Sequence, residues 1–198
     1  GNYFLQSTPE LLTDAELNGV RIVGCAAGGF STILVSDEGR VFAMGRNFFG
    51  QLGLGHTNDV NTPHEIDAAH FGDAPVVAVA CGECHMLALT REGKLFSCGK
   101  GHYGATGLGH TTDATTPQPV VGPLADARVV RIVAGTNHSI ALTEDGRVFG
   151  FGDCGGVPAG GAQGLPQLLQ GALADTTVRA LGGGSNAGHT VFVAGPPP

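Results

Sequence analysis

The chain has 198 residues, 34 of them glycine, and a formal net charge of −7 at pH 7. This acidic balance argues against direct binding of nucleic acid, because lysine and arginine neutralise phosphates, and it favours a protein partner with a basic surface. No apolar stretch approaches the roughly 20 residues that a membrane-spanning helix needs, so no membrane role is expected.

The cysteines and the chain ends add weaker expectations. Five cysteines, mostly in apolar runs, are interpreted as reduced thiols, which indicates an intracellular protein, cytoplasmic or nuclear. Residues 1–7 are interpreted as a tag remnant or a loop, since Tyr3-Phe4-Leu5-Gln6-Ser7 is similar to a protease-tag scar and no secretory signal pattern is present.

One motif recurs along the chain at a nearly constant interval. Its copies are Thr8-Pro9, Thr62-Pro63 and Thr116-Pro117, spaced by 54 residues, and a degraded Leu165-Pro166. A period near fifty residues is typical of propellers, solenoids and arrays. The expected organisation is propeller repeats over 8–193, divided into 8–61, 62–115, 116–164 and 165–193, with a Pro-rich tail over 194–198.

Within each repeat, short apolar runs rich in β-branched residues predict buried strands rather than helices. The expected strands are 20–23, 31–35 and 40–45 in the first repeat, 76–79, 85–89 and 94–99 in the second, 129–133, 138–142 and 147–152 in the third, and 177–181 and 189–193 in the fourth. The chain is therefore predicted to be all-β.

Glycines mark the connections between these strands. The turns Asp37-Glu38-Gly39, Arg91-Glu92-Gly93 and Glu144-Asp145-Gly146 are expected to close hairpins through a bulge, because glycine accepts positive φ at no steric cost. After the third strand, a Gly-rich loop returns to the next Thr-Pro, at Gly50 to His56 and again at Gly104 to His110.

These motifs, in this order, resemble the regulator of chromosome condensation repeat family. The matching segments are Cys25-Ala26-Ala27-Gly28, Ala134-Gly135-Thr136-Asn137-His138, Thr143 to Phe149, and Gly50-Gln51-Leu52-Gly53-Leu54-Gly55. The resemblance covers about residues 8 to 193 and implies a β-propeller with a four-stranded sheet per blade. Met44, Cys98 and Phe151 occupy the family's tryptophan position.

The number of repeats falls short of a closed ring. Propellers usually close with about four to eight blades, whereas the repeats here supply about 3.5 blades. We expect either a piece of a longer product or a ring that other chains complete, self-association included.

Several motifs invite a cofactor or metal interpretation that their context does not support. Cys81-Gly82-Glu83-Cys84-His85 matches the c-type haem pattern, but Gly82 and His85 fall on repeat positions, so packed thiols are the expected role. Gly99 to Gly104 matches G-x-G-x-x-G without a helix start at its last glycine. The recurring His85, His138 and His189 are expected to satisfy buried backbone groups. No cofactor and no metal are predicted.

The copies differ most in the loop after the third strand. Aromatic residues sit beside a cation there in two repeats, a composition enriched at protein interfaces. The candidate partner-binding residues are Arg46, Asn47, Phe48, Phe49, Lys100, His102 and Tyr103. The alternative interpretation is that the aromatic residues only cover the blade edge.

The sequence shows no arrangement of a nucleophile, a base and an orienting group, so no covalent enzyme chemistry is expected. The leading hypothesis is a protein–protein interaction scaffold. The family resemblance also implies an alternative, guanine-nucleotide exchange on a Ran-like small GTPase, which needs no such residues.

Overall fold

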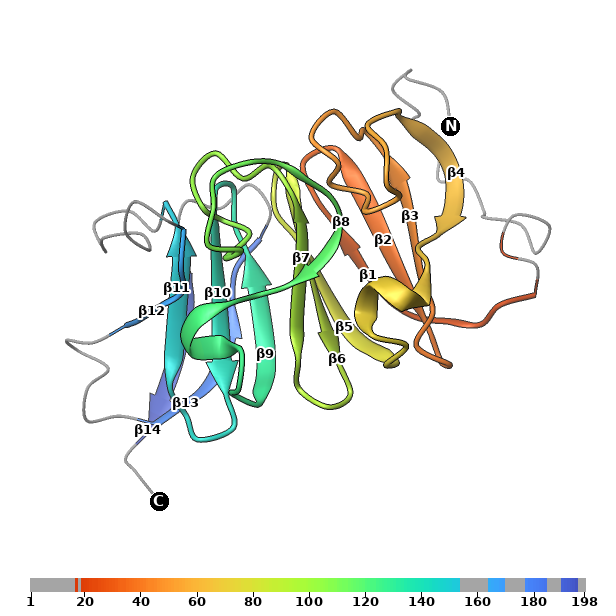
Figure 1. The fold of residues 1–198 in the computed structure, drawn as a ribbon. Coiled ribbons are helices and arrows are strands. Elements are labelled where there is room, and N and C mark those ends of the chain that lie inside the picture. Colours follow the sequence, from red (N-terminus) through yellow and green to blue (C-terminus); the bar gives the residue numbers. More distant parts are fainter. Residues whose placement is uncertain (1–16, 18, 154–163, 170–176, 185–189, 196–198) are drawn as a thin grey trace.

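The computed structural model describes residues 17, 19–153, 164–169, 177–184 and 190–195. In these ranges, antiparallel sheets stand side by side in chain order, from β1–β4 at one end to β13–β14 at the other (Figure 1). The strands are β1 (Ile22–Ala27), β2 (Ser31–Ser36), β3 (Val41–Gly45), β4 (Val60–Glu65), β5 (Val76–Cys81), β6 (His85–Thr90), β7 (Leu95–Gly99), β8 (Ala114–Pro119), β9 (Val129–Ala134), β10 (His138–Thr143), β11 (Val148–Gly152), β12 (Gln167–Leu168), β13 (Thr177–Gly182) and β14 (Val191–Gly195).

Each of the first three sheets is a four-stranded meander in which every strand pairs with the next one along the chain. The fourth sheet consists of β13 and β14. The first strands of successive sheets also lie next to each other, because β5 contacts both β1 and β9, and β9 contacts β13. This is the arrangement of blades around an axis, so the prediction of an all-β propeller arc with about 3.5 blades is confirmed.

The outermost strand of each blade was not located from the residue pattern. Thr62-Pro63 lies within β4 and Thr116-Pro117 within β8, so a repeat that begins at Thr-Pro begins in the last strand of a sheet. These strands are polar and contain proline, which is tolerated at a sheet edge because one side needs no ladder hydrogen bonds. Two short 3-10 helices, Ala68–Phe71 and Gly122–Leu124, then lead into the next blade.

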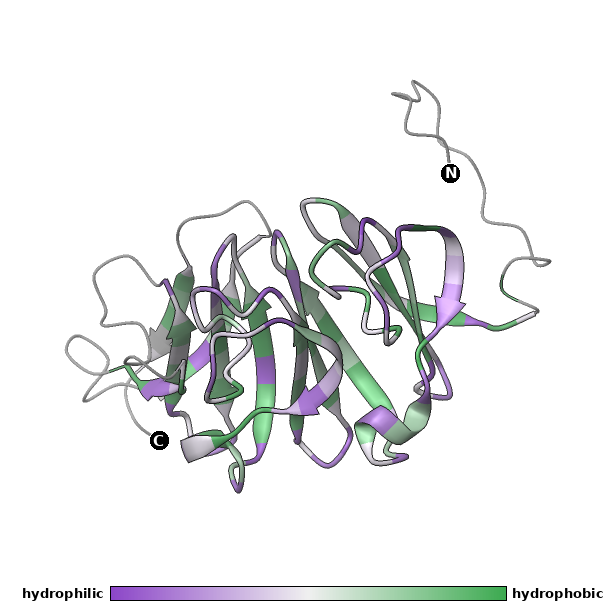
Figure 2. Cartoon of the chain, turned by 45° about the horizontal axis from the view of Figure 1, so that its top comes forward, coloured by the Kyte–Doolittle hydropathy of each residue, from purple (hydrophilic) through white to green (hydrophobic). Residues whose placement is uncertain are grey.

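The apolar core lies between the sheets. One cluster joins the first two blades through residues such as Ile33 and Met86, a second joins the next pair through Leu87 and Phe149, and a third packs Ile140 against Val178. Hydrophobic residues accordingly run along the strands in the interior of the row (Figure 2).

The two ends of the row are more exposed than its middle. Val23 of β1 is 60% exposed, and Val191 and Val193 of β14 are each 57% exposed. No further sheet covers them among the residues that the structure describes. The segments 1–7, 154–163 and 196–198, and His189, lie outside those residues.

The glycine turns between the second and third strands also join neighbouring blades. Gly39 and Gly93 have φ values of 85° and 82°, as the predicted hairpin turns require. The carbonyl of Gly39 accepts a hydrogen bond from the amide of Val76 at 3.1 Å, and that of Gly93 accepts one from the amide of Val129 at 2.9 Å. A Cβ at Gly93 would lie 2.6 Å from Cγ of Arg128, so this close approach requires glycine.

The recurring histidine is a second link between blades. Nε2 of His85 lies 2.9 Å from Oγ of Ser139, and Nε2 of His138 lies 3.0 Å from Oγ1 of Thr190. The role is structural, as expected, but these ring nitrogens bond a hydroxyl of the following blade instead of a backbone group. The first blade has Ser31 at this position, and the second has Met86 where the hydroxyl would stand.

Candidate protein-interaction surface

The loops that follow β3 and β7 begin from the same backbone frame. The amide of Arg46 donates to the carbonyl of Phe30 at 2.8 Å, and the amide of Lys100 donates to the carbonyl of Cys84 at 2.8 Å. Phe30 and Cys84 occupy equivalent places in the turns between the first two strands of their blades. The backbone frame is therefore the same in the two blades, while the side chains that it carries differ.

A carboxylate fixes the start of each loop. Oδ1 of Asp59 accepts the amide of Asn47 at 2.9 Å, and Oδ1 of Asp113 accepts the amide of Gly101 at 2.9 Å. The Asn47 side chain is buried, donates to the carbonyl of His56 at 2.7 Å and accepts the amide of Leu52 at 3.0 Å. Asn47 therefore organises its loop, and its fully buried side chain is not available to a partner.

The remaining candidate residues lie on one end of the arc, and two blades contribute to them. Phe48 is 77% exposed and Tyr103 is 45% exposed. The Lys100 ammonium lies 4.9 Å from the ring centre of Phe49, in the preceding blade, and 5.9 Å from that of Tyr103. His102 packs edge-on against Tyr103, with ring centres 4.6 Å apart. We call Arg46, Phe48, Phe49, Lys100, His102 and Tyr103 the loop surface.

A shallow pocket of about 450 Å³ opens beside the loop surface, between the first two blades. Its lining includes Phe30, Arg46, Phe48, Phe49, Asp59 and Cys84. The Arg46 guanidinium stacks over the ring of Phe30, with 4.8 Å between its central carbon and the ring centre. Sequence reasoning did not select Phe30 and Cys84 for this surface. Their position in the repeat could have indicated them, since both directly precede the second strand of their blade.

The residues of the C-x-x-C-H motif diverge in the folded chain. Cys81 is packed in the core between the first two blades, where burial raises the pKa of its thiol to about 12. Cys84 faces the pocket, and partial burial, followed by the nearby Glu83, raises its pKa. His85 is buried at the joint with the third blade. Packing of Cys81 is thus confirmed, and no group of three or more metal-ligating side chains occurs within the described ranges.

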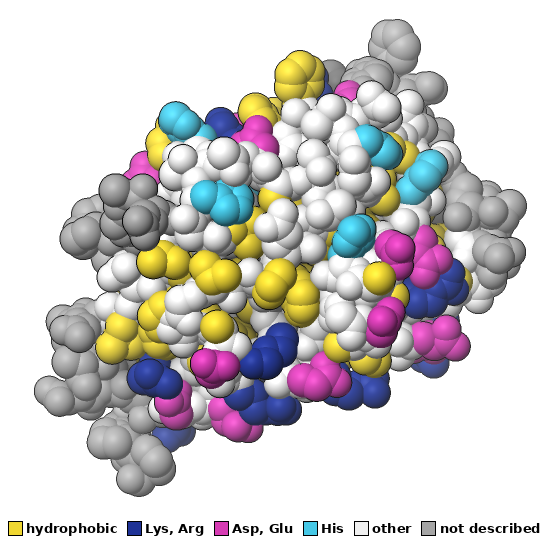
Figure 3. Space-filling model, in the orientation of Figure 1, with side chains coloured by type: hydrophobic (Ala, Val, Ile, Leu, Met, Phe, Trp, Pro, Cys, Tyr) yellow, Lys and Arg dark blue, Asp and Glu magenta, His cyan; other side chains and the backbone are white. Residues whose placement is uncertain are grey.

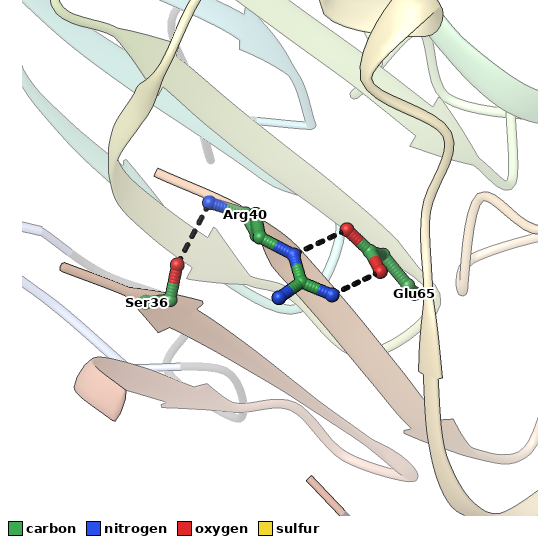
Figure 4. Close-up of polar contacts among 3 residues, drawn as sticks. All are labelled: Ser36, Arg40 and Glu65. Atoms are coloured by element: carbon green, nitrogen blue, oxygen red, sulfur yellow. Dashed lines mark hydrogen bonds and ion pairs between the residues drawn. The ribbon is translucent and has the colours of Figure 1, made fainter. Parts of the chain in front are cut away.

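The opposite end of the arc is different in character. Basic and acidic side chains alternate along the lower edge in Figure 3, and the ion pairs Arg40–Glu65, Arg128–Glu144 and Arg147–Asp145 lie among the turns at this end. Arg40 binds Glu65 with two nitrogens, at 2.7 and 2.5 Å (Figure 4). The charges of these six residues are thus paired with each other within the chain.

No helix in the described part of the chain is both long and apolar enough to cross a bilayer.

Comparison with known proteins assigns the class. The model of the Regulator of chromosome condensation (RCC1) repeat matches residues 38–89 and 92–142, which together make up just over half of the chain, and a second model of the same repeat matches 22–51 and 76–105. The chain belongs to the RCC1 repeat family, as the motif order predicted.

Individual relatives agree with this assignment. The chain is 37% identical over 137 residues to the ultraviolet-B receptor UVR8 of Arabidopsis thaliana, covering 69% of this chain and 30% of that protein. It is 34% identical over 153 residues to the RCC1-like G exchanging factor-like protein of Mus musculus, covering 76% and 33%. The chain thus spans about a third of the length of these relatives.

Solved structures show the same fold. Human WBSCR16 superposes with a TM-score of 0.73 at 30% identity, covering 84% of this chain and 43% of that one. Yeast RCC1 (Prp20) in its complex with Kap60 superposes with a TM-score of 0.70 at 26% identity, covering 88% and 42%.

Proposed function

We propose that the chain is a protein-recognition module of the RCC1 repeat type, and that the loop surface contacts the partner. The observation that carries this proposal is the exposure of Phe48 and Tyr103 on loops that the buried Asn47 and the Asp59 and Asp113 carboxylates hold in place. Exposed aromatic side chains on a rigid frame lose little conformational entropy on binding, which favours their use as anchors.

A combined variant, Phe48→Ala with Tyr103→Ala, tests this proposal. The variant and the wild-type chain would be used to capture proteins from a cell lysate, with Arg91→Ala, an exposed residue in the turn after β6, as the matched control. We expect the double variant to keep its melting temperature and lose specific partners that the control retains. If the double variant retains these partners, Phe48 and Tyr103 do not contact them. If the double variant fails to fold, the two rings cover the blade edge instead.

A second candidate function is guanine-nucleotide exchange. Its support is the identity to the RCC1-like G exchanging factor-like protein of the mouse. Exchange requires a surface that binds the nucleotide-free GTPase and no covalent chemistry. Faster release of a fluorescent GDP analogue from a Ran-type GTPase in the presence of this chain would support it. An unchanged release rate would contradict exchange and leave protein recognition as the only proposed function.

The setting that we propose is intracellular, cytoplasmic or nuclear. The four cysteines in the described ranges, Cys25, Cys81, Cys84 and Cys98, are free thiols, and reduced thiols are typical of these compartments. Fractionation of cells that produce the tagged full-length protein would test this.

A further inference from the structure

The pocket between the first two blades has an aromatic wall. Phe30 comes from the turn before β2, and Phe48 and Phe49 come from the loop after β3. The rings of Phe48 and Phe49 lie 6.1 Å apart at 60°. Phe30 is 46% exposed, so part of this wall is in contact with solvent. A wall of this kind gains free energy when it covers an apolar side chain.

Two cations lie against that wall. Arg46 stacks on Phe30, and Lys100 lies over Phe49. None of the ion pairs found in the described ranges involves either residue; those pairs use Arg21, Arg40, Arg128 and Arg147. Stacking fixes the plane of a guanidinium while its edge N–H groups stay available, which suits a bidentate bond to a carboxylate.

The nearby acidic groups are anchored to the backbone or lie outside the pocket. Asp59 lines the pocket, and its Oδ1 holds the amide of Asn47. Asp113 holds the amide of Gly101 in the same way. Among the described residues, Glu83, in the turn next to Cys84, is a further carboxylate close to this region, and it does not line the pocket. The pocket lining therefore contains one positive charge, on Arg46, and one negative charge, on Asp59. Lys100 adds a positive charge beside the pocket.

Resting on the proposed function, we propose that this pocket recognises an acidic–apolar peptide segment of the partner. An aromatic or large aliphatic side chain of the segment packs on Phe48 and Phe49, and an adjacent Asp or Glu pairs with Arg46 or Lys100. Arg46 and Lys100 supply the positive groups for this contact, whereas the net charge of −7 by itself favours a basic partner. Charge at the contact decides which segment fits, whereas the net charge acts at longer range.

Selection from random nine-residue peptides displayed on phage tests the proposal with the full 198-residue chain as bait. We expect the enriched peptides to share a carboxylate within two positions of an aromatic or large aliphatic residue. For the best synthetic peptide, Arg46→Glu should weaken binding about tenfold or more, and Arg46→Lys should weaken it less. Arg91→Glu, the same charge change at the other end of the arc, should leave binding unchanged.

Three results would overturn the inference: enriched peptides that are basic or lack carboxylates, binding that Arg46→Glu does not alter, or no enrichment at all. Circular dichroism of each variant separates lost binding from lost folding. If the selection fails while lysate capture still depends on Phe48 and Tyr103, the recognition module stands and only the acidic–apolar specificity falls. If both fail, the loop surface has no such role.

Discussion

His85 and Ser139 bond across the joint between the second and third blades, and their environment fixes which atom carries the proton. Oγ of Ser139 donates to the carbonyl of Ala105 at 2.7 Å, so it accepts from His85, whose Nε2 lies 2.9 Å away. Nε2 of His85 therefore carries a proton, and the ring is neutral at pH 7 because burial lowers its pKa to about 4. This bond ties one blade to the next through groups that are both buried.

The first prediction concerns acid. Burial, with the charge of His138 adding to it, lowers the pKa of His85 from 6.5 to about 4. Between these values the unfolded chain binds a proton that the folded chain does not, so the free energy of unfolding falls as pH drops from about 6.5 to about 4. The loss from this group is roughly 3 kcal/mol. Urea unfolding at pH 7 and pH 4.5 measures it.

His85→Gln is the control for that experiment. It should be less stable than wild type at pH 7 but lose less stability between the two pH values. Hydrogen bonds to Arg40 and Thr143 are the main cause of the lowered pKa values of Glu65 and Asp145. Protonation of these two carboxyl groups in acid therefore lowers the free energy of unfolding of wild type and variant alike. An equal pH dependence of the two proteins would contradict the role of His85.

The second prediction compares two buried serines. Oγ of Ser31 has no hydrogen-bond partner among the described residues, whereas Oγ of Ser139 bonds both His85 and Ala105. Removing an unsatisfied buried hydroxyl relieves its desolvation cost, so Ser31→Ala should stabilise the chain by about 0.5–1 kcal/mol. Ser139→Ala should destabilise it by about 1–3 kcal/mol because His85 loses its acceptor. Thermal melts of both variants test the contrast, and a loss of stability in Ser31→Ala would refute it.

The third prediction tests the glycine turns. Gly93→Val should lower the free energy of unfolding by at least about 1–3 kcal/mol, because a β-branched residue is strained at a φ of 82° and its Cβ would meet Arg128. Gly24 lies in β1 with open space around its Cβ position, so Gly24→Val should stay within about 0.5 kcal/mol of wild type. Equal melting temperatures for the two variants would disprove the turn argument.

The fourth prediction concerns the ion pair at the lower edge. The side chains of Arg40 and Glu65 are 37% and 42% exposed, so solvent screens their attraction despite the two-point geometry. Glu65→Gln should cost less than about 1 kcal/mol, and the cost should shrink in 1 M salt. A larger, salt-independent cost would mean that the pair is desolvated to a degree that its exposure does not indicate.

The inner three strands of the first three blades could be read from sequence because they are short apolar runs bounded by glycine turns, and the second strand of each, β2, β6 and β10, is buried along nearly its whole length. The outer strands could not, since β4 and β12 expose polar residues and only their pairing with β3 and β11 makes them strands. For the same reason, Thr-Pro marked the period correctly but not the start of a sheet.

The candidate site was predictable in its location and not in its detail. Variation between the copies led to Phe48, Lys100 and Tyr103, which the structure places on one surface. Asn47 lies among the variable loop residues and so was selected as a contact residue. Its side-chain bonds to Leu52 and His56 form only once the loop has folded, and the sequence does not show them. Phe30 is 16 residues before Arg46 in the chain, so their stacking depends on the β2–β3 hairpin bringing them together.

The placement of the apolar clusters between sheets, and not inside any single one, has a consequence for how the molecule opens. A blade in the middle of the row packs against two of these apolar clusters, whereas a blade at an end packs against one. Unfolding should therefore begin at the end blades and proceed toward the middle ones. In hydrogen exchange, the amide hydrogens of β1 and β14 should exchange first and those of β6 and β10 last.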